Sequence, residues 1–193
     1  AWVAFRPQPE TAAALAMQLG GAQSFTSDAD FELAPRFSPD GGQVIYAQGR
    51  GRETRLVIRD VAGTVVATIV KPDVLMLSPM FLRDRERIVY WQRAGDACAI
   101  VERHLASGAE REIVGCAQLL QPPFDVSPDG THLAWLAPRD GVLNVWVAPR
   151  DNPAAARPVT NDTLRGIRFY AWSFRGDILY IQDIGGDENC HIY

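Results

Sequence analysis

The feature of this sequence that most restricts its fold is an internal repeat. Four segments each begin with a large apolar residue, continue through a polar turn, and end in an apolar run closed by an aromatic side chain. Counted along the residue numbers, their starts are 44, 45 and 46 residues apart. A period of about 40–50 residues with strand-forming content is typical of β-propeller blades. The four segments are Phe37–Tyr46, Phe81–Tyr90, Val126–Trp135 and Trp172–Tyr180.

The turns inside these segments have the composition that a tight β-turn requires. Ser38–Gly41 reads Ser-Pro-Asp-Gly, and the same four residues recur at Ser127–Gly130. Serine suits the first turn position, proline presets φ at the second, and glycine suits the last. The apolar runs that follow do not alternate with polar residues, as expected for strands buried between two neighbouring sheets. We therefore assign the two serines a structural role in the turns.

This repeat predicts an all-β fold, a partial β-propeller of about four antiparallel four-stranded blades, the last of them truncated. The blades are expected at about 33–70, 77–116, 122–160 and 169–193, within a propeller region 22–193. Residues 1–21 are expected to form a tail with a linker helix over Pro9–Leu19, which begins at a proline and ends at a pair of glycines. An open arc of blades leaves two exposed sheet edges, so we expect self-association through them.

Charge and hydropathy exclude some classes of partner. The formal net charge is −4, and the basic residues are scattered singly, which argues against nucleic-acid binding because phosphates require a clustered basic surface. Arg83, Arg85 and Arg87 alternate with other residues and are expected to line one solvated strand face. No apolar run reaches the roughly 18 residues of a membrane helix. The apolar start, Ala1–Phe5, fits either the remnant of an export signal or a plain tail.

Two of the three cysteines fall on neighbouring predicted strands. In a hairpin folded about Ser107 and Gly108, paired residue numbers sum to about 214, a condition that Cys98 and Cys116 meet. Directly opposed Cβ atoms lie about 4.5–5.5 Å apart, close to what a disulfide spans. The alternative is two small buried thiols. A disulfide would imply an oxidising compartment, so we expect the chain to be periplasmic or otherwise exported.

The sequence lacks the motifs of a catalytic domain. It contains no G-x-S-x-G elbow, no P-loop and no Ser, Asp and His in a triad order, so we predict that this chain is not itself an enzyme. Cys190 and His191 are adjacent, but no second ligand pair has a suitable spacing, so we expect no metal. No cofactor motif is present.

One polar cluster is unusual. Asp183–Asn189 places three carboxylates and an amide within seven residues, around a Gly-Gly pair between two predicted strands. One interpretation is a hairpin loop whose acids are merely solvated. The other is a propeller rim that binds a cationic group such as a peptide amino terminus. On the second interpretation the candidate substrate-binding residues are Asp187, Glu188 and Asn189.

Two resemblances follow from these residues. The Ser-Pro-Asp-Gly repeats resemble the TolB-type propeller repeat over most of residues 24–193. Residues 122–193 are more specifically similar to the amino-terminal propeller of prolyl-oligopeptidase-family serine peptidases, which include dipeptidyl and acylaminoacyl peptidases. The runs that carry this similarity are LNVWVAP (143–149), RPVTNDTLRGIRF (157–169) and GGDENCHIY (185–193). Cys190 departs from the pattern, because the family usually has an aromatic there.

The peptidase resemblance implies a function for the propeller. In that family the propeller caps a separate α/β-hydrolase domain, which carries the catalytic triad, and it filters peptide substrates by size. Some relatives bind the substrate amino group with propeller acids, a role that Asp187 and Glu188 match in position. The resemblance thus implies a gating or substrate-binding propeller within a larger serine peptidase. Its expected partners are peptide substrate, the hydrolase domain and further blades.

Residues 1–120 resemble a different class of protein. The run FTSDADFELAPRFSPDG (25–41) and the Cys98 and Cys116 hairpin look like the periplasmic propeller of membrane-anchored winged-helix regulators. The alternative function is therefore a periplasmic sensor that binds a ligand or a protein. A third interpretation is a structural adaptor in the manner of TolB. An upstream winged helix would favour the sensor, and a downstream G-x-S-x-G elbow would favour the peptidase.

Overall fold

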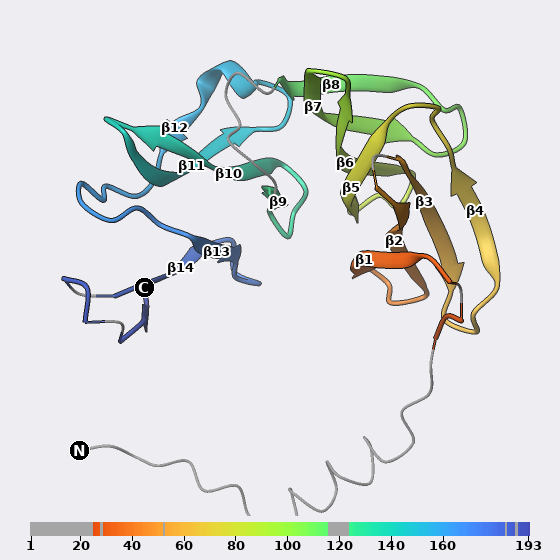
Figure 1. The fold of residues 1–193 in the computed structure, drawn as a ribbon, viewed down its shortest axis with the longest axis horizontal. Coiled ribbons are helices and arrows are strands. Elements are labelled where there is room, and N and C mark those ends of the chain that lie inside the picture. The colour runs from red at the N-terminus through yellow and green to blue at the C-terminus, as the bar shows by residue number, and fades with distance from the viewer. Residues whose placement is uncertain (1–24, 28, 52, 116–123, 184, 188) are drawn as a thin grey trace, which may run out of the picture.

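A computed structural model describes residues 25–27, 29–51, 53–115, 124–183, 185–187 and 189–193. The predicted helix over 9–19 lies outside this part of the chain. Four antiparallel sheets follow one another, each made of strands paired in chain order. The sheets are arranged around a common centre, with the first strand of each nearest to it (Figure 1). The prediction of an all-β partial propeller with four blades is confirmed. No helix among the described residues is long and apolar enough to cross a membrane.

Each sheet is one blade, and the last is the smallest. Blade 1 consists of β1 (Phe31–Phe37), β2 (Gln43–Arg50), β3 (Glu53–Asp60) and β4 (Val65–Ile69). Blade 2 consists of β5 (Leu75–Phe81), β6 (Arg87–Ala94), β7 (Ala97–His104) and β8 (Glu110–Gly115). Blade 3 consists of β9 (Phe124–Val126), β10 (His132–Arg139), β11 (Val142–Pro149) and β12 (Arg157–Pro158), with a 3₁₀ turn, η2 (Pro153–Ala155), before β12. Blade 4 consists of β13 (Phe169–Trp172), β14 (Ile178–Gln182) and β15 (His191–Ile192).

The four repeated aromatic residues occupy equivalent places in successive blades. In each blade the last residue of the first strand pairs with a residue two positions before the aromatic: Phe37 with Val44, Phe81 with Ile88, Val126 with Leu133, and Trp172 with Ile178. Tyr46, Tyr90, Trp135 and Tyr180 therefore all lie on the second strand at the same height. This register confirms that the 44–46-residue period is the blade period.

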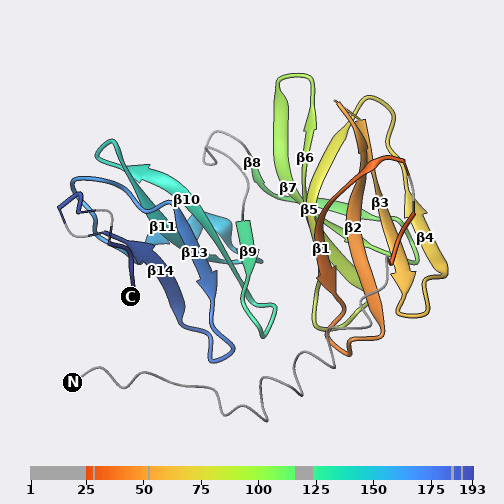
Figure 2. The same ribbon diagram turned by 60° about the horizontal axis from the view of Figure 1, so that its bottom comes forward.

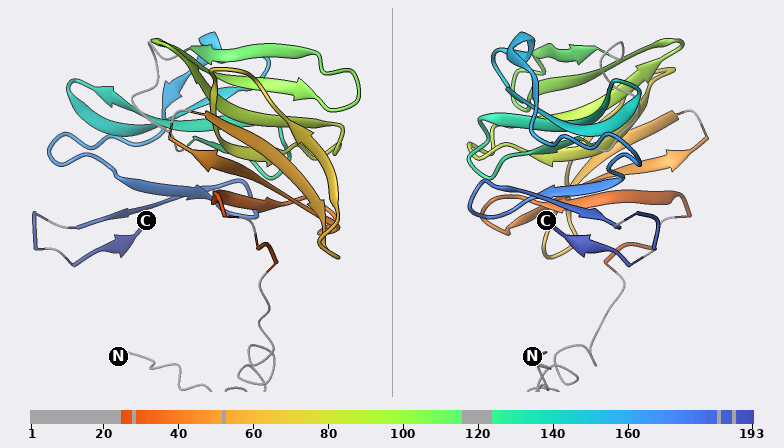
Figure 3. Two further views of the ribbon diagram at one scale, coloured as in Figure 1. Left: turned by 45° about the vertical axis from the view of Figure 1, so that its right-hand side comes forward. Right: turned by 90° about the vertical axis from the view of Figure 1, so that its left-hand side faces the viewer.

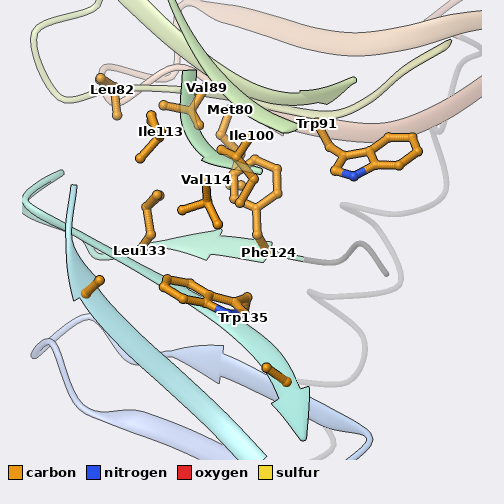
Figure 4. Packing of buried hydrophobic residues seen from close by; sticks show 12 residues of the cluster. Met80, Leu82, Val89, Trp91, Ile100, Ile113, Val114, Phe124, Leu133 and Trp135 are labelled. Carbon is orange, nitrogen blue, oxygen red and sulfur yellow. The ribbon is translucent and has the colours of Figure 1, made fainter. Parts of the chain in front are cut away.

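Neighbouring blades are held together mainly by apolar side chains. Between blades 2 and 3, Leu82, Ile100 and Ile113 face Leu133 and Trp135 across the gap between the sheets (Figure 4). A second cluster joins blades 1 and 2. Figure 3 shows the sheets packed face on face from two further directions. The middle strands of blades 2 and 3 lie between two neighbouring sheets, so they are apolar on both faces, as the non-alternating pattern predicted. In blade 4, by contrast, Leu179 and Ile181 of β14 stay exposed.

The ring is open between the first and last blades (Figure 1). Phe37 of blade 1 is 69% exposed, whereas Phe81, its counterpart in blade 2, is 8% exposed because blade 1 covers it. Blade 4 exposes Phe169 and Ile192. The same repeat position is thus core or surface according to whether a neighbouring blade is present.

The Ser-Pro-Asp-Gly turns join the first and second strands of blades 1 and 3, at the lower ends of these hairpins in Figure 2. In blade 3 the Ser127 hydroxyl donates to Asp129 at 2.6 Å and accepts from the backbone N–H of His132 at 2.9 Å. Gly130 has φ +76°, and its N–H donates to the Ser127 carbonyl oxygen. Ser38 makes the same contacts in blade 1 and is buried like Ser127. These hydrogen bonds account for both serines structurally.

One expectation about basic residues was wrong. Arg83 and Arg85 lie in the turn between β5 and β6, and only Arg87 begins a strand. Arg85 occupies the position that glycine holds in the other blades, with φ +62°, and it forms an ion pair with Asp40 of blade 1. Arginines that alternate with other residues are compatible with a turn as well as with a strand, so the sequence pattern did not distinguish these two structures.

The turn carboxylates predict how stability depends on pH. Hydrogen bonds from the Ser127 hydroxyl and from Thr131 lower the pKa of Asp129 from 3.8 to about 2. Because the folded-state pKa is lowered, this stabilisation is present above pH 3.8 and is lost as the pH falls from there to about 2. We expect the midpoint of urea denaturation to be flat above pH 5 and to fall between pH 4 and 2. Asp129→Asn should flatten part of that fall, whereas Asp151→Asn, at an exposed carboxylate, should leave the profile unchanged. Identical profiles for all three proteins would contradict this account.

Two of the three cysteines lie among the described residues. Cys98 is disulfide-bonded, and Cys190 is free and exposed. In the β7–β8 hairpin, Ala99 lies opposite Gly115, so paired residue numbers sum to 214 as expected. Cys116 lies outside the described residues, so its pairing with Cys98 stays a prediction. Closing a loop of this length contributes about 3 kcal/mol in the chain-entropy model.

Candidate functional site

The acidic loop between β14 and β15 is a glycine-hinged turn. Gly185 has φ +65° and Gly186 has φ +90°, values that favour glycine and that turn the chain back toward β15. The Asn189 backbone N–H donates to Asp187 Oδ1 at 3.0 Å, and Asn189 Nδ2 donates to Oδ2 at 3.3 Å. The structure therefore brings two of the three predicted site residues together. Both are exposed, and Glu188 lies outside the described residues.

An arginine from the preceding loop anchors this turn. Arg165 Nε lies 3.2 Å from Asp183 Oδ1, and the Asp183 side chain is only 12% exposed. The guanidinium also lies over Gly186, where a Cβ would collide with Arg165 Nη1. The guanidinium could shift to admit a Cβ, so it is the positive φ that favours glycine at this position. Asp183 is paired with Arg165 and mostly buried, whereas the side chain of Asp187 is exposed.

The loop that carries Arg165 is in turn held by a buried asparagine. Asn144, on β11, is 0% exposed. Its Oδ1 accepts from Asp162 N at 2.7 Å and from Thr160 Oγ1 at 2.9 Å, and its Nδ2 donates to the carbonyl oxygens of Val142 and Asp162. All four hydrogen-bonding positions of the amide are used, as a fully buried amide requires.

Asp162 connects Asn144 to the turn that carries Arg165. Its carboxylate accepts from the backbone N–H groups of Leu164 at 2.7 Å and Arg165 at 3.1 Å. Partial burial raises the pKa of Asp162, but these backbone donors outweigh burial and lower the pKa overall. The carboxylate is therefore charged at neutral pH and holds the turn closed. A continuous set of contacts runs from Asn144 through Asp162 and Arg165 to Asp183.

These contacts join three sequence runs that are far apart in the chain. Asn144 belongs to LNVWVAP, Asp162 and Arg165 belong to TNDTLRG, and Gly186, against which Arg165 lies, belongs to GGDEN. The sequence singled out the last of these as a site, but it did not identify Asn144 or Arg165. The available signal was that all three runs carry the same family resemblance, which is expected when distant residues support one site.

The chemistry of this site is that of binding. An exposed carboxylate beside an amide can accept charge-assisted hydrogen bonds from an ammonium group. The described residues contain no group of three or more His, Cys, Asp or Glu side chains able to hold a metal ion. They form β-sheets and connecting turns, with no α/β domain among them.

The fold defines the class of protein to which the chain is similar. It matches TolB from Acinetobacter baumannii with a TM-score of 0.71 at 16% identity, covering 88% of this chain and 42% of that one. It also matches a puromycin hydrolase with a TM-score of 0.60 at 18% identity, covering 88% of this chain and 30% of that one. These matches confirm the resemblance to TolB-type propellers and show the fold. No family model matches the chain.

Part of the chain is also closely similar in sequence to one curated protein. The chain is 61% identical over 69 residues to dipeptidyl aminopeptidase BIII of Pseudoxanthomonas mexicana. The match covers 35% of this chain and 10% of that protein. The predicted resemblance to dipeptidyl peptidases is thus confirmed over the matched residues, which make up only a tenth of that relative's length.

Proposed function

We propose that this chain is the non-catalytic propeller portion of a prolyl-oligopeptidase-like serine peptidase, and that its acidic loop binds the free amino end of a peptide substrate. The observation that carries the proposal is the 61% identity to a dipeptidyl aminopeptidase. An aminopeptidase must distinguish a charged amino terminus from other parts of a peptide. The exposed carboxylate of Asp187 has the charge for that task, and the Arg165 and Asp183 ion pair fixes the loop that bears it.

Binding to the loop can be tested on the chain as it is. We expect alanyl-alanine amide to shift the backbone NMR resonances of Gly185 and Gly186, because its ammonium approaches Asp187. The acetylated dipeptide amide, which has no charge at its amino end, should shift neither. Asp187→Asn should abolish the effect, and Asp151→Asn, at an exposed aspartate on blade 3, should retain it. Equal shifts from both peptides, or none at millimolar concentration, would refute the binding role.

The non-catalytic assignment has its own test. The chain should not hydrolyse a chromogenic dipeptide substrate, because the described residues contain no activated nucleophile. Measurable turnover by the purified chain would overturn the assignment. The comparisons favour the peptidase over the periplasmic sensor, because the curated relative is a peptidase. Extending the gene downstream to a G-x-S-x-G elbow would support this choice, whereas an upstream winged helix would reverse it.

We propose an oxidising compartment for the protein, periplasmic or otherwise exported. The support is that Cys98 is disulfide-bonded, since structural disulfides persist where thiols are not kept reduced. A non-reducing peptide map of protein taken from the native cells should show Cys98 linked to Cys116. Recovery of Cys98 as a free thiol would contradict the proposal.

We further propose that the free faces of blades 1 and 4 pack against additional blades, a hydrolase domain or other copies of the chain. Phe37 and Phe169 are each more than two-thirds exposed on these faces, and such apolar surface favours association. Light scattering of the isolated chain should therefore show dimers or larger species. A sharp monomer peak together with cooperative melting would count against this proposal.

A further inference from the structure

A buried carboxylate, Glu102 of β7, lies at the junction between blades 2 and 3. Its side chain is 10% exposed, and Glu102 Oε2 lies 3.2 Å from Nη1 of Arg150 in blade 3. Arg87 and Arg111 of blade 2 donate to the same carboxylate, each at 3.0 Å. Burial raises the pKa of Glu102, but the three arginines outweigh burial and lower the pKa overall. Glu102 is therefore charged at neutral pH although it is buried.

The position of Glu102 is apolar in the neighbouring blades. Ile58 of blade 1, Glu102 of blade 2 and Val147 of blade 3 are equivalent, because each pairs with the residue just before the repeated aromatic of its blade. Ile58 is buried in the apolar cluster that joins blades 1 and 2. Blade 2 thus has a carboxylate where the repeat supplies an apolar side chain in blades 1 and 3.

Arg150 departs from the repeat as well. It directly follows the third strand of its blade, as Val61 does in blade 1 and Leu105 in blade 2. In all three blades the backbone N–H of this residue donates to a carbonyl oxygen in the turn between the first two strands, so the three residues are equivalent. Leu105 packs against the same cluster as Ile58. The two positions are therefore apolar at the junction of blades 1 and 2, and oppositely charged at the junction of blades 2 and 3.

Stability alone does not account for this charged pair. Two ions lose hydration when they are buried, and an apolar pair of similar size is often as stable or more so. What the charges add is selectivity, because a charge buried without its partner is strongly unfavourable. Arg150 depends on Glu102 in this way: its Nε is buried without a hydrogen bond, and among the described residues no other acid pairs with it.

The similar blades of this chain make such selectivity necessary. The third strands of blades 1, 2 and 3 have the same pairing register, so their faces are alternative surfaces for blade 3 while the chain folds. Exchange between similar units is a characteristic misfolding event of repeat proteins. On blade 1, or on blade 3 of a second copy, Arg150 would meet Ile58 or Val147 and would be buried without an acid. On blade 2 it meets Glu102.

We propose that Arg150 commits blade 3 to pack on blade 2, because it requires the carboxylate of Glu102, and that this requirement prevents exchange of blades between copies of the chain during folding. The pair acts as a selective contact within an otherwise apolar set of junctions. Ile58 and Leu105, its counterparts at the preceding junction, have no such selectivity.

Urea denaturation of three variants tests whether Arg150 requires Glu102. Glu102→Ile should lower the folding equilibrium constant by about a hundredfold or more, because it leaves Arg150 buried without an acid. Arg150→Leu alone should lower it less, because Glu102 keeps Arg87 and Arg111. In the Glu102→Ile protein, however, Arg150→Leu should raise the constant by about tenfold or more. A double variant less stable than Glu102→Ile would overturn the proposal.

Exchange of blades is measured by refolding two copies together. Copies with and without a polyhistidine tag are unfolded in urea without reductant, then refolded either jointly or apart and mixed afterwards. The excess of untagged chain recovered with the tag after joint refolding measures exchange, since association of folded copies contributes equally to both protocols. We expect no excess for the unchanged protein, and at least about threefold more untagged chain after joint refolding for Glu102→Ile combined with Arg150→Leu.

Leu105→Ala is the matched control for exchange. It weakens the apolar contact between blades 1 and 2 but leaves Glu102 and Arg150 in place, so it should lower stability without causing exchange. The proposal would be overturned if the double variant showed no excess, or if Leu105→Ala showed an equal one. These measurements do not involve the acidic loop, so their result is independent of the proposed function.

Discussion

Replacing Trp135 by alanine is expected to destabilise the protein by about 3–5 kcal/mol, the cost of removing a large buried side chain together with the cavity that remains. Trp135 is 1% exposed and lies in the cluster between blades 2 and 3, beside Phe124 and Leu133 (Figure 4). Folded domains are stable by only about 5–15 kcal/mol, so this loss is a large share of the total. The midpoint of thermal unfolding should fall by about 10 °C.

The repeat supplies a matched control for this substitution. Tyr180 occupies the same strand position in blade 4 but is only partly buried. Tyr180→Ala should therefore cost about 1–2 kcal/mol, in proportion to the smaller apolar area that it buries. Trp135→Phe, which keeps most of the apolar bulk, should cost less than Trp135→Ala. Urea denaturation followed by circular dichroism measures all three free energies. Equal losses at Trp135 and Tyr180 would show that burial between blades is not what stabilises the fold.

Replacing Asn144 by alanine is expected to cost about 3 kcal/mol and to loosen the candidate site. The substitution leaves the Asp162 N–H, the Thr160 hydroxyl and two carbonyl oxygens without their partner, and an unsatisfied buried polar group costs about 1–3 kcal/mol. Water entering the vacated space offsets part of this loss. The loop that holds Arg165, and through it Asp183, should become less ordered.

Hydrogen exchange tests this second prediction residue by residue. The Asp162 amide donates to Asn144 Oδ1, so it should lose protection in Asn144→Ala. Asn161→Ala is the control, because Asn161 is exposed and lies in the same loop. It should change stability by less than about 0.5 kcal/mol. Exchange that speeds up equally in both variants would contradict the role of Asn144 in holding the loop.

Much of the fold could be predicted because blade structure is local. Each turn, each apolar run and each hairpin register involves residues within about 45 positions of one another, and these repeat with the blade. The turn chemistry of Ser38 and Ser127 and the equivalence of the four aromatic residues followed from that period. The interpretation of Arg83 and Arg85 failed because a turn and a strand can share the same alternation of charge.

The candidate site was predicted less completely. The Gly-Gly pair marked the loop, and the structure brings Asp187 and Asn189 together in it. Asn144 and Arg165 were missed because their roles depend on contacts between strands and loops that a linear sequence does not display. The residues that flank Asn144 and Arg165 in the sequence do not indicate that these two side chains make such contacts.

By itself, the sequence determined the blade: its period, its turns, the apolar middle strand and the hairpin register that places Cys98 near the end of β8. These depend on short-range backbone conformations and on patterns that recur every 44–46 residues. Only the tertiary structure decided which repeated positions are core, since Phe37 is exposed and Phe81 is buried. It also decided that Arg165 meets Asp183 and that three arginines surround Glu102. The physical reason is that burial and ion pairing depend on which surfaces face each other, and that is settled only when the blades pack together.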